Sequence, residues 1–264
     1  MRFGDPGSAA NRERFLRGAG LEPGLVRGIE PAHTRTVLFP SRGDDPAAMA
    51  RASGGADGIV LLDPELAASV TVADCMPIWL LDRGSGAFGV LHSGWRGTGI
   101  LDAALRALAD RFGSPPSAVA LVLGPAIGPC CYAVPEERAL RFEAEFGDGS
   151  VARRDGSAYL DLRQANIAIA ERAGVGQLLS VEACTSCDGR LGSFRRQGAA
   201  AFTRMLAVCG RGPPGPPERV PQDELYLRVD AAQLVRRPLL QGRVVGGVEP
   251  EQEALFLLHR SHQV

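Results

Sequence analysis

Three residues with metal-binding side chains stand at the ends of segments expected to be strands. His33 begins the alternating stretch HTRTVLFP, Cys75 ends SVTVADC, and His92 lies near the end of GAFGVLHS. Strand ends can bring distant side chains into one pocket. Two histidines and one cysteine suit a zinc ion whose fourth position stays open to water or substrate. The competing interpretation is ordinary core, because single histidines are commonly hydrogen-bonded structural residues and free cysteine is often buried.

The loop after His92 is typical of a ligand-binding turn. Residues 93–97 read SGWRG, and a helix is expected directly after them. Glycines allow the backbone to approach a ligand closely. An arginine beside a helix N-terminus is suited to bind an anion. Arg96 is therefore a candidate anion ligand, and the alternative is a tight turn with a solvated arginine.

Two other segments carry cysteines. The stretch LGPAIGPCCYAV places Cys130, Cys131 and Tyr132 in a turn rich in Gly and Pro. This turn is either a rigid structural turn with two buried thiols or a wall of the site. Residues 184–187 read CTSC, a single CxxC. Without a second pair this spacing is weak evidence for zinc or redox chemistry, so a structural or incidental role is expected.

The positively charged residues are all arginines, 29 in number, and the chain has no lysine. This excludes Schiff-base catalysis and the phosphate-binding lysine of a P-loop. Two of the arginines, Arg195 and Arg196, stand together in the loop SFRRQG. They either contact an anionic or planar ligand or remain solvated.

Composition limits the partners. The net charge is −1 over 264 residues, which gives no electrostatic basis for binding nucleic acid or an anionic membrane. The first residues lack the apolar run of a secretory signal, and AVALVLGPAIG is too short to span a bilayer. Six cysteines are too sparse for a disulfide scaffold. We therefore expect a cytoplasmic protein with neither a nucleic acid nor a membrane as partner.

The elements that must position these residues are both helices and strands. Amphipathic periodicity predicts helices, and short apolar runs with turn residues predict buried strands. The turn DRGSG should join two of these strands in a hairpin. The absence of a regular βαβ rhythm favours the α+β class. Expected helices are 9–19, 97–112, 135–147 and 162–174, expected strands are 33–40, 58–63, 69–75, 77–82, 86–93 and 118–128, and 199–209 is strand or helix.

A proline-rich break divides the chain. Residues 210–221 read GRGPPGPPERVP and are expected to form an extended linker. The sequence thus predicts a main domain at 1–209 and a small C-terminal appendage of unknown role at 222–264.

Taken together, these motifs resemble the polyphenol-oxidase or laccase-domain family, whose members are viewed as zinc-dependent purine nucleoside phosphorylases. TVADCMPI resembles the family's T-A-D-C-x-P, LHSGWRG its H-A-G-W-R-G, and LGPAIGPCCYAV its G-P-x-I-G-x-x-C-Y-x-V. The resemblance covers about residues 2–209. It implies a single α+β domain with two mixed β-sheets sandwiched between helix layers.

The resemblance also implies a ligand set and an activity. Zinc would be held by His33, Cys75 and His92, although His33 lies in PAHTRTV rather than in the family's Q-V-H-G motif. The implied reaction is phosphorolysis of adenosine- or inosine-type nucleosides, with adenosine deamination as a side activity. Arg96 would position phosphate, and Asp74 would orient a ligand or transfer a proton. The remaining candidates, for substrate binding, are Cys131, Tyr132, Arg195 and Arg196.

Three alternatives stay open. Copper could occupy a His2Cys set and oxidise phenols, but coupled copper clusters need more imidazoles and only His259 and His262 remain. A non-catalytic metal-binding protein is the second, because the family's upstream T-R-x-G-G-V-S motif is not found in this chain. Hydrolysis, which would use the same residues, is the third. The expected partners are a nucleoside and phosphate, and a homo-oligomer is left open.

Overall fold

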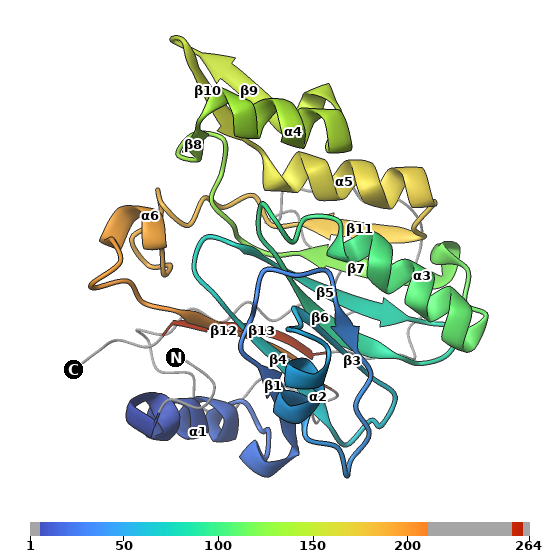
Figure 1. Ribbon diagram of the computed structural model, residues 1–264. Helices are drawn as coiled ribbons and strands as arrows, with labels where there is room; N and C mark the ends of the chain where they lie inside the picture. The colour runs from blue at the N-terminus through green and yellow to red at the C-terminus, as the bar shows by residue number, and fades with distance from the viewer. Residues whose placement is uncertain (1–5, 211–254, 261–264) are drawn as a thin grey trace.

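The computed structural model describes residues 6–210 and 255–260, which form two stacked β-sheets between helices (Figure 1). The larger sheet has six strands in the order β11-β7-β5-β6-β3-β2, and the second has the order β1-β4-β12-β13. A small sheet, β8-β10-β9, lies beside α4. The strands of the large sheet are β2 Val37–Leu38, β3 Gly58–Leu61, β5 Met76–Asp82, β6 Phe88–Ser93, β7 Val119–Leu123 and β11 Gln177–Ser180. The others are β1 Val26–Ile29, β4 Ala67–Val72, β12 Met205–Gly210, β13 Leu255–Arg260, β8 Ala133–Val134, β9 Val151–Arg154 and β10 Ser157–Leu160.

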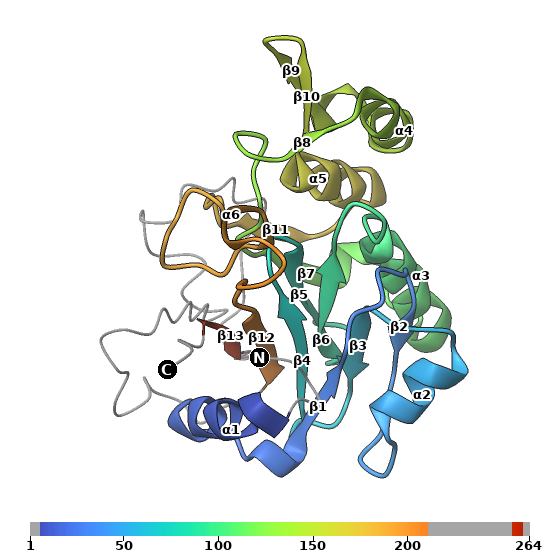
Figure 2. The same ribbon diagram turned by 60° about the vertical axis from the view of Figure 1, so that its left-hand side comes forward.

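Helices cover the outer faces of the two sheets. The turned view in Figure 2 shows α1 beside the four-stranded sheet and α3 and α5 beside the six-stranded one. Three clusters of buried side chains fill the spaces between these layers. Between the sheets, the indole N–H of Trp79 donates to the carbonyl of Val208 at 2.9 Å. The helices are α1 Ala9–Gly18, α2 Pro46–Ala52, α3 Ile100–Phe112, α4 Glu136–Phe146, α5 Leu162–Ala173 and α6 Phe194–Gln197.

The hairpin β5-β6 is the element that places the site. All residues of β5 are buried, as expected of a strand covered on both faces. The strands are antiparallel, and Pro77 pairs with His92. Cys75 directly precedes β5, so it lies at the same end of the sheet as His92. The predicted hairpin and its DRGSG turn are confirmed, and buried Asp82 accepts a hydrogen bond from the backbone N–H of Gly84 at 2.9 Å.

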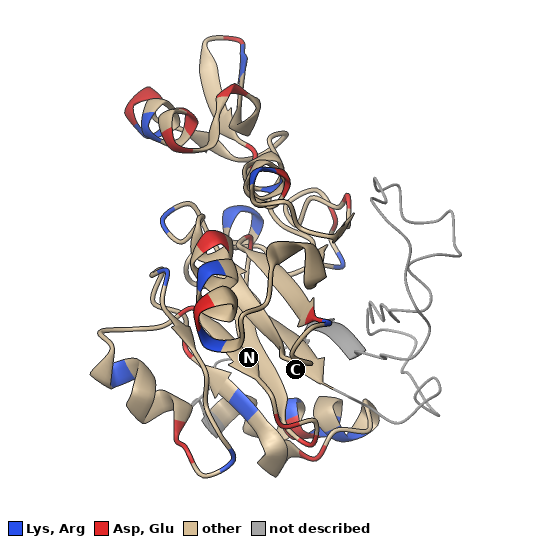
Figure 3. Ribbon diagram, turned by 90° about the vertical axis from the view of Figure 1, so that its right-hand side faces the viewer, with Lys and Arg blue, Asp and Glu red and all other residues tan. Residues whose placement is uncertain are grey.

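The expected helices are confirmed. The longest, α3, buries a stripe that includes Leu101, Leu105 and Leu108, and it ends at Gly113 with a φ of 67°. Glycine adopts this left-handed conformation without the penalty that a Cβ brings. Acidic and basic residues both occur along α3 and α4 (Figure 3). The helices therefore turn a polar, mixed-charge side to solvent while their apolar stripes pack on the core.

Two expectations about strands change. The segment 33–40 is a strand only at Val37–Leu38, and the residues before it form a loop. Residues 199–209, left undecided above, end in β12, which is buried along its whole length between β4 and β13. The sequence did not predict α2, β1, the β9-β10 hairpin or β11, and the expected loop SFRRQG instead contains the short helix α6.

The described part of the C-terminal region adds one strand to the four-stranded sheet. Residues 255–260 form β13, which pairs antiparallel with β12 as the edge of the four-stranded sheet. Apart from Gly210, which ends β12, the expected linker at 210–221 lies outside the described residues, as does most of the expected appendage at 222–264, so the domain boundaries stay a prediction. Within the described part of the chain, no helix has the length and apolar character needed to cross a membrane.

Candidate metal centre and pocket

The structure brings the three predicted metal ligands together. His33 comes from the loop before β2, Cys75 from the turn before β5, and His92 from β6. One donor atom from each lies within 4.8 Å of the other two. The two imidazole rings are 5.0 Å apart and nearly perpendicular. His92 is buried, Cys75 half-buried and His33 exposed, so the site is open on the His33 side. Two imidazole nitrogens and a thiolate at this spacing fit a zinc ion with one free position.

Asp57 orients two of these ligands. Its fully buried carboxylate lies 2.7 Å from Nδ1 of His92. It also accepts the backbone N–H groups of residues 32–34 at 3.2, 2.9 and 2.6 Å. A carboxylate on Nδ1 leaves Nε2 of His92 free for a metal and fixes the plane of the ring. Sequence reasoning missed Asp57, because a lone aspartate in the turn GADG gives no sign of its partner 35 residues away.

Two residues at the site have left-handed backbone conformations. His33 has a φ of 60° and Asp74, just before Cys75, a φ of 78°. Non-glycine residues in this region are uncommon and often mark functional sites. Each is held by hydrogen bonds. The backbone N–H of His33 donates to Asp57 at 2.9 Å, while the carboxylate of Asp74 accepts from Thr185 Oγ1 at 2.6 Å and from the backbone N–H of Arg195 at 2.7 Å.

The ligands are electrostatically coupled. Burial opposes ionisation of the Cys75 thiol, but the charge of His92 and hydrogen bonds from both histidines outweigh it and lower the pKa of Cys75 to about 6. Burial likewise opposes the charged form of His92, yet Cys75 and Asp57 raise the pKa of this imidazole. Without metal, the site therefore favours a thiolate beside an imidazolium. A bound metal cation would replace a proton of the His92 imidazolium and stabilise the Cys75 thiolate.

A pocket of about 480 Å³ opens onto the three ligands. This volume is in the range of small-molecule sites. Its walls are largely apolar and aromatic, which suits a planar ring system. The aromatic side chains that line it are Trp95, Tyr132, Phe194 and Phe202.

Three arginines line the pocket together with the carboxylates of Glu30 and Asp74. The guanidinium of Arg138 lies 4.3 Å from the ring centroid of Trp95, and that of Arg195 lies 5.5 Å from that of Tyr132. Arg204 is the third arginine of the lining. Stacking on aromatic rings holds a guanidinium in a defined orientation. Sequence reasoning did not single out Arg138, since an arginine in an amphipathic helix resembles a solvated one.

The other predicted site residues divide into two groups. Asp74, Tyr132 and Arg195 line the pocket. Arg96 is exposed, packs 5.0 Å from the Trp95 ring centroid and is not part of the lining, because its side chain leaves the turn toward solvent. Arg196 instead donates to backbone carbonyls between residues 185 and 191 and braces that loop.

The turn that carries Cys130 and Cys131 does not fit the first of its two interpretations, a structural turn with two buried thiols. Cys130 is exposed and Cys131 only half-buried, so the turn does not enclose two buried thiols. Cys131 lies outside the pocket lining, and its sulfur is 3.4 Å from that of Cys187.

Comparison with known proteins shows the family of the chain. Residues 6–211 match the family described as multi-copper polyphenol oxidoreductase laccase. The chain belongs to this family. The resemblance inferred from the ADC, SGWRG and CCY motifs is therefore confirmed, and the match covers nearly all of the main domain.

Relatives in this laccase family carry the name purine nucleoside phosphorylase. The chain is 32% identical to YlmD of Geobacillus stearothermophilus over 69% of this chain and 70% of that protein. It is 35% identical to a purine nucleoside phosphorylase of Deinococcus radiodurans over 76% of each. The crystal structure of YlmD superposes on this chain with a TM-score of 0.69 at 27% sequence identity. The match covers 77% of this chain and 79% of the YlmD chain. A Bacillus licheniformis protein, YfiH, gives a TM-score of 0.67 at 25% identity. The predicted α+β fold with two mixed sheets between helices is confirmed.

Proposed function

We propose that this chain is a zinc-dependent purine nucleoside phosphorylase acting on adenosine- or inosine-type nucleosides. The observation that carries the proposal is the position of the His33, Cys75 and His92 donors at one pocket lined by arginines and aromatic rings. The names of the relatives support the same reaction class. A nucleoside and phosphate together present a planar base and an anion, and the pocket has side chains suited to each.

In phosphorolysis, a phosphate oxygen forms a bond to C1′ of the ribose while the bond from C1′ to the base nitrogen breaks. The base leaves with the bonding electron pair and gains a proton. Arg138, Arg195 and Arg204 would bind the phosphate, because guanidinium groups form strong charge-assisted hydrogen bonds with it. A zinc ion held by the two histidines and Cys75 would supply a Lewis acid for an oxygen ligand.

The aromatic side chains have the complementary task. Trp95 and Tyr132 would pack against the base and orient it. Asp57 holds the His92 imidazole for metal binding. Both carboxylate oxygens of Asp74 already accept hydrogen bonds from Thr185 and Arg195. This favours a positioning role for Asp74 over proton transfer, the two roles left open by the sequence.

The test is a product analysis of the purified protein with adenosine, with and without phosphate. Release of adenine and ribose 1-phosphate only when phosphate is present supports phosphorolysis. Adenine and free ribose without phosphate would indicate hydrolysis, and inosine would indicate deamination. A metal-loaded protein that yields none of these products, from inosine as well as adenosine, would favour the non-catalytic alternative.

Copper-dependent phenol oxidation is the second candidate, favoured by the family description and by a His2Cys set that copper also accepts. The residues limit it to a mononuclear site, because His33 and His92 are the only histidines in 6–210. Copper-loaded and zinc-loaded samples assayed side by side on a phenol and on adenosine would separate the two functions.

A further inference from the structure

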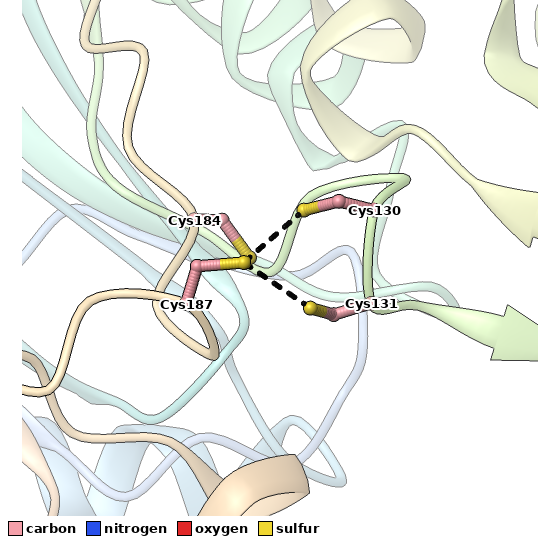
Figure 4. Close-up of side chains that lie close together, drawn as sticks. All are labelled: Cys130, Cys131, Cys184 and Cys187. Atoms are coloured by element: carbon pink, nitrogen blue, oxygen red, sulfur yellow. Dashed lines mark hydrogen bonds between the residues drawn. The ribbon is translucent and has the colours of Figure 1, made fainter.

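Four cysteines gather at a second place, away from the three pocket ligands. Cys130 and Cys131 come from the loop between β7 and β8, and Cys184 and Cys187 from the loop after β11. Figure 4 shows their side chains pointing toward one another from these two loops. Their four sulfur atoms all lie within 4.8 Å of one another. Four of the six cysteines of the chain thus meet at one point.

The spacing of the sulfurs suits a metal better than a disulfide. The Sγ atoms of Cys130 and Cys187 are 3.6 Å apart, and those of Cys131 and Cys187 are 3.4 Å apart. A tetrahedron with metal–sulfur bonds of about 2.3 Å has sulfur–sulfur edges of about 3.8 Å. A disulfide needs a separation of about 2.0 Å. All four cysteines are free thiols in the structure.

The backbone at Gly128 contacts the sulfur atoms of the cluster closely. The N–H of Gly128 donates to Sγ of Cys184 at 3.2 Å. Such an N–H group stabilises a metal-bound thiolate and orients it. A side chain at Gly128 would place its Cβ 3.2 Å from Sγ of Cys130 and 3.4 Å from Cβ of Cys184. Glycine here lets the two loops approach each other.

Arginines surround the two loops. Arg154 donates to the carbonyls of Pro129 and Cys130 at 2.8 and 2.9 Å. Arg195 donates to the carbonyl of Cys131 at 3.2 Å, and Arg196 braces the other loop as described above. Four thiolates around a divalent ion carry a net charge of −2, which these guanidinium groups would offset.

We propose that Cys130, Cys131, Cys184 and Cys187 form a structural zinc site that is separate from the His33, Cys75 and His92 centre. On binding, the four thiols give up their protons to solvent and form four zinc–sulfur bonds, with no change of oxidation state. Four protein ligands leave no open position, which is the character of a structural site. The ion would clamp the β7-β8 loop to the loop after β11.

This clamp would support the wall of the pocket. Tyr132 directly follows Cys131, and Arg195 is hydrogen-bonded to the Cys131 carbonyl. Both side chains line the pocket. The structural zinc would therefore affect the shape of the pocket without touching its contents.

The first experiment counts metal in the purified chain. The expected result is two zinc ions per chain in the wild type, one in the double variant Cys184→Ser/Cys187→Ser, and one in Cys75→Ser. Cys209→Ala is the matched control, because this cysteine is buried in β12 outside both clusters, and it should keep two. A wild type with a single zinc that the double variant retains would overturn the proposal.

Cobalt substitution then identifies the ligands. Thiolate-to-cobalt charge-transfer absorption grows with the number of sulfur ligands, so the four-cysteine site should absorb roughly four times as strongly as the site with Cys75 alone. Cys75→Ser should therefore keep most of this absorption and the double variant should lose most of it. The opposite pattern would contradict the assignment.

Alkylation of the wild type makes the test independent of whether variants fold. Cys130 and Cys187 are exposed, so as free thiols they are accessible to iodoacetamide at an alkaline pH, where thiols ionise. Bound zinc predicts protection of all four cysteines in the native protein and their labelling after addition of a strong chelator. Rapid labelling without chelator, or a Cys–Cys disulfide found by peptide mass spectrometry, would overturn the proposal. None of these readouts depends on turnover, so failure of the phosphorylase proposal would leave them unaffected.

Discussion

The chain carries two clusters of metal-binding side chains that differ in chemistry and setting. The cluster of His33, Cys75 and His92 has three mixed donors, lies beside the buried hairpin β5-β6 and opens into a pocket. The four-cysteine cluster joins two surface loops with sulfur donors only. Three ligands with an open position suit catalysis, and four thiolates suit a structural role. On this basis we propose that the first cluster performs the chemistry and that the second stiffens the pocket wall.

The supports of the two clusters differ in the same way. At the first, one buried carboxylate, Asp57, bonds to a ligand side chain and to the loop that carries another ligand. At the second, arginines donate to backbone carbonyls and the backbone N–H of Gly128 donates to the sulfur of Cys184. A site that exchanges ligands needs precisely oriented donors, whereas a structural site needs loops that are held together.

Replacing Cys75 gives the sharpest separation of the two clusters. Cys75→Ser removes the only sulfur donor of the pocket site, and we expect turnover to fall by more than about 100-fold, since loss of an outer partner alone commonly costs 10- to 100-fold. The zinc of the four-cysteine site should remain. The measurement is adenine release together with metal content. Unchanged turnover in Cys75→Ser would break the assignment of catalysis to this cluster.

Asp57→Asn tests the support of the first cluster. The amide cannot accept all the hydrogen bonds that the carboxylate accepts from His92 and residues 32–34, and its NH2 group would face donors. We expect the metal affinity of the pocket site to fall about 10- to 100-fold.

Chelator competition on this variant would show the loss. Asp63→Asn is the control, because Asp63 pairs with Arg42 at the surface at 3.0 Å and contacts neither cluster. An equal loss of affinity in both variants would contradict the role of Asp57.

How much of this was predictable depends on how local each signal is. The hairpin β5-β6 and helix α3 were predicted because turn residues and side-chain periodicity report on neighbours in the chain. Residues 199–209 stayed undecided, because a short apolar run fits a buried strand and a buried helix equally well. Only the pairing of β12 with β4 and β13 decides it.

The site shows the same limit. The three ligands of the pocket site were predicted from their motifs, and the structure brings them together. Asp57 and Arg138 were missed, because their partners belong to segments that meet only in the folded chain. The CC pair and the CTSC segment each looked weak alone, and their meeting across 53 or more residues could not be inferred from spacing.

Arg138→Ala tests whether phosphate binds in the pocket beside the His33, Cys75 and His92 cluster. Loss of one charge-assisted hydrogen bond to phosphate should raise the KM for phosphate about tenfold, which corresponds to about 1.4 kcal/mol. The KM for the nucleoside should change less. Arg141→Ala is the matched control on the same helix, because Arg141 pairs with Glu137 in solvent. An unchanged phosphate KM in Arg138→Ala would remove this arginine from the proposed phosphate site.

The smallest expected effect on turnover belongs to the second cluster. Cys187→Ser removes one ligand of the proposed structural zinc and should loosen the loop before Tyr132 and the contact of Arg195 with Cys131. We expect a few-fold rise in the nucleoside KM with little change in kcat. A loss of about 2 kcal/mol in stability would lower the unfolding temperature by about 4–8 °C for a domain of this size.

Thermal unfolding with and without added zinc provides the measurement. The wild type should be stabilised by zinc more than Cys187→Ser, because an ion that binds only the folded state raises its stability by mass action. Cys209→Ala should respond like the wild type. A fall in kcat as large as that of Cys75→Ser would mean that the four-cysteine cluster takes part in the chemistry, and the division of roles between the two clusters would then be wrong.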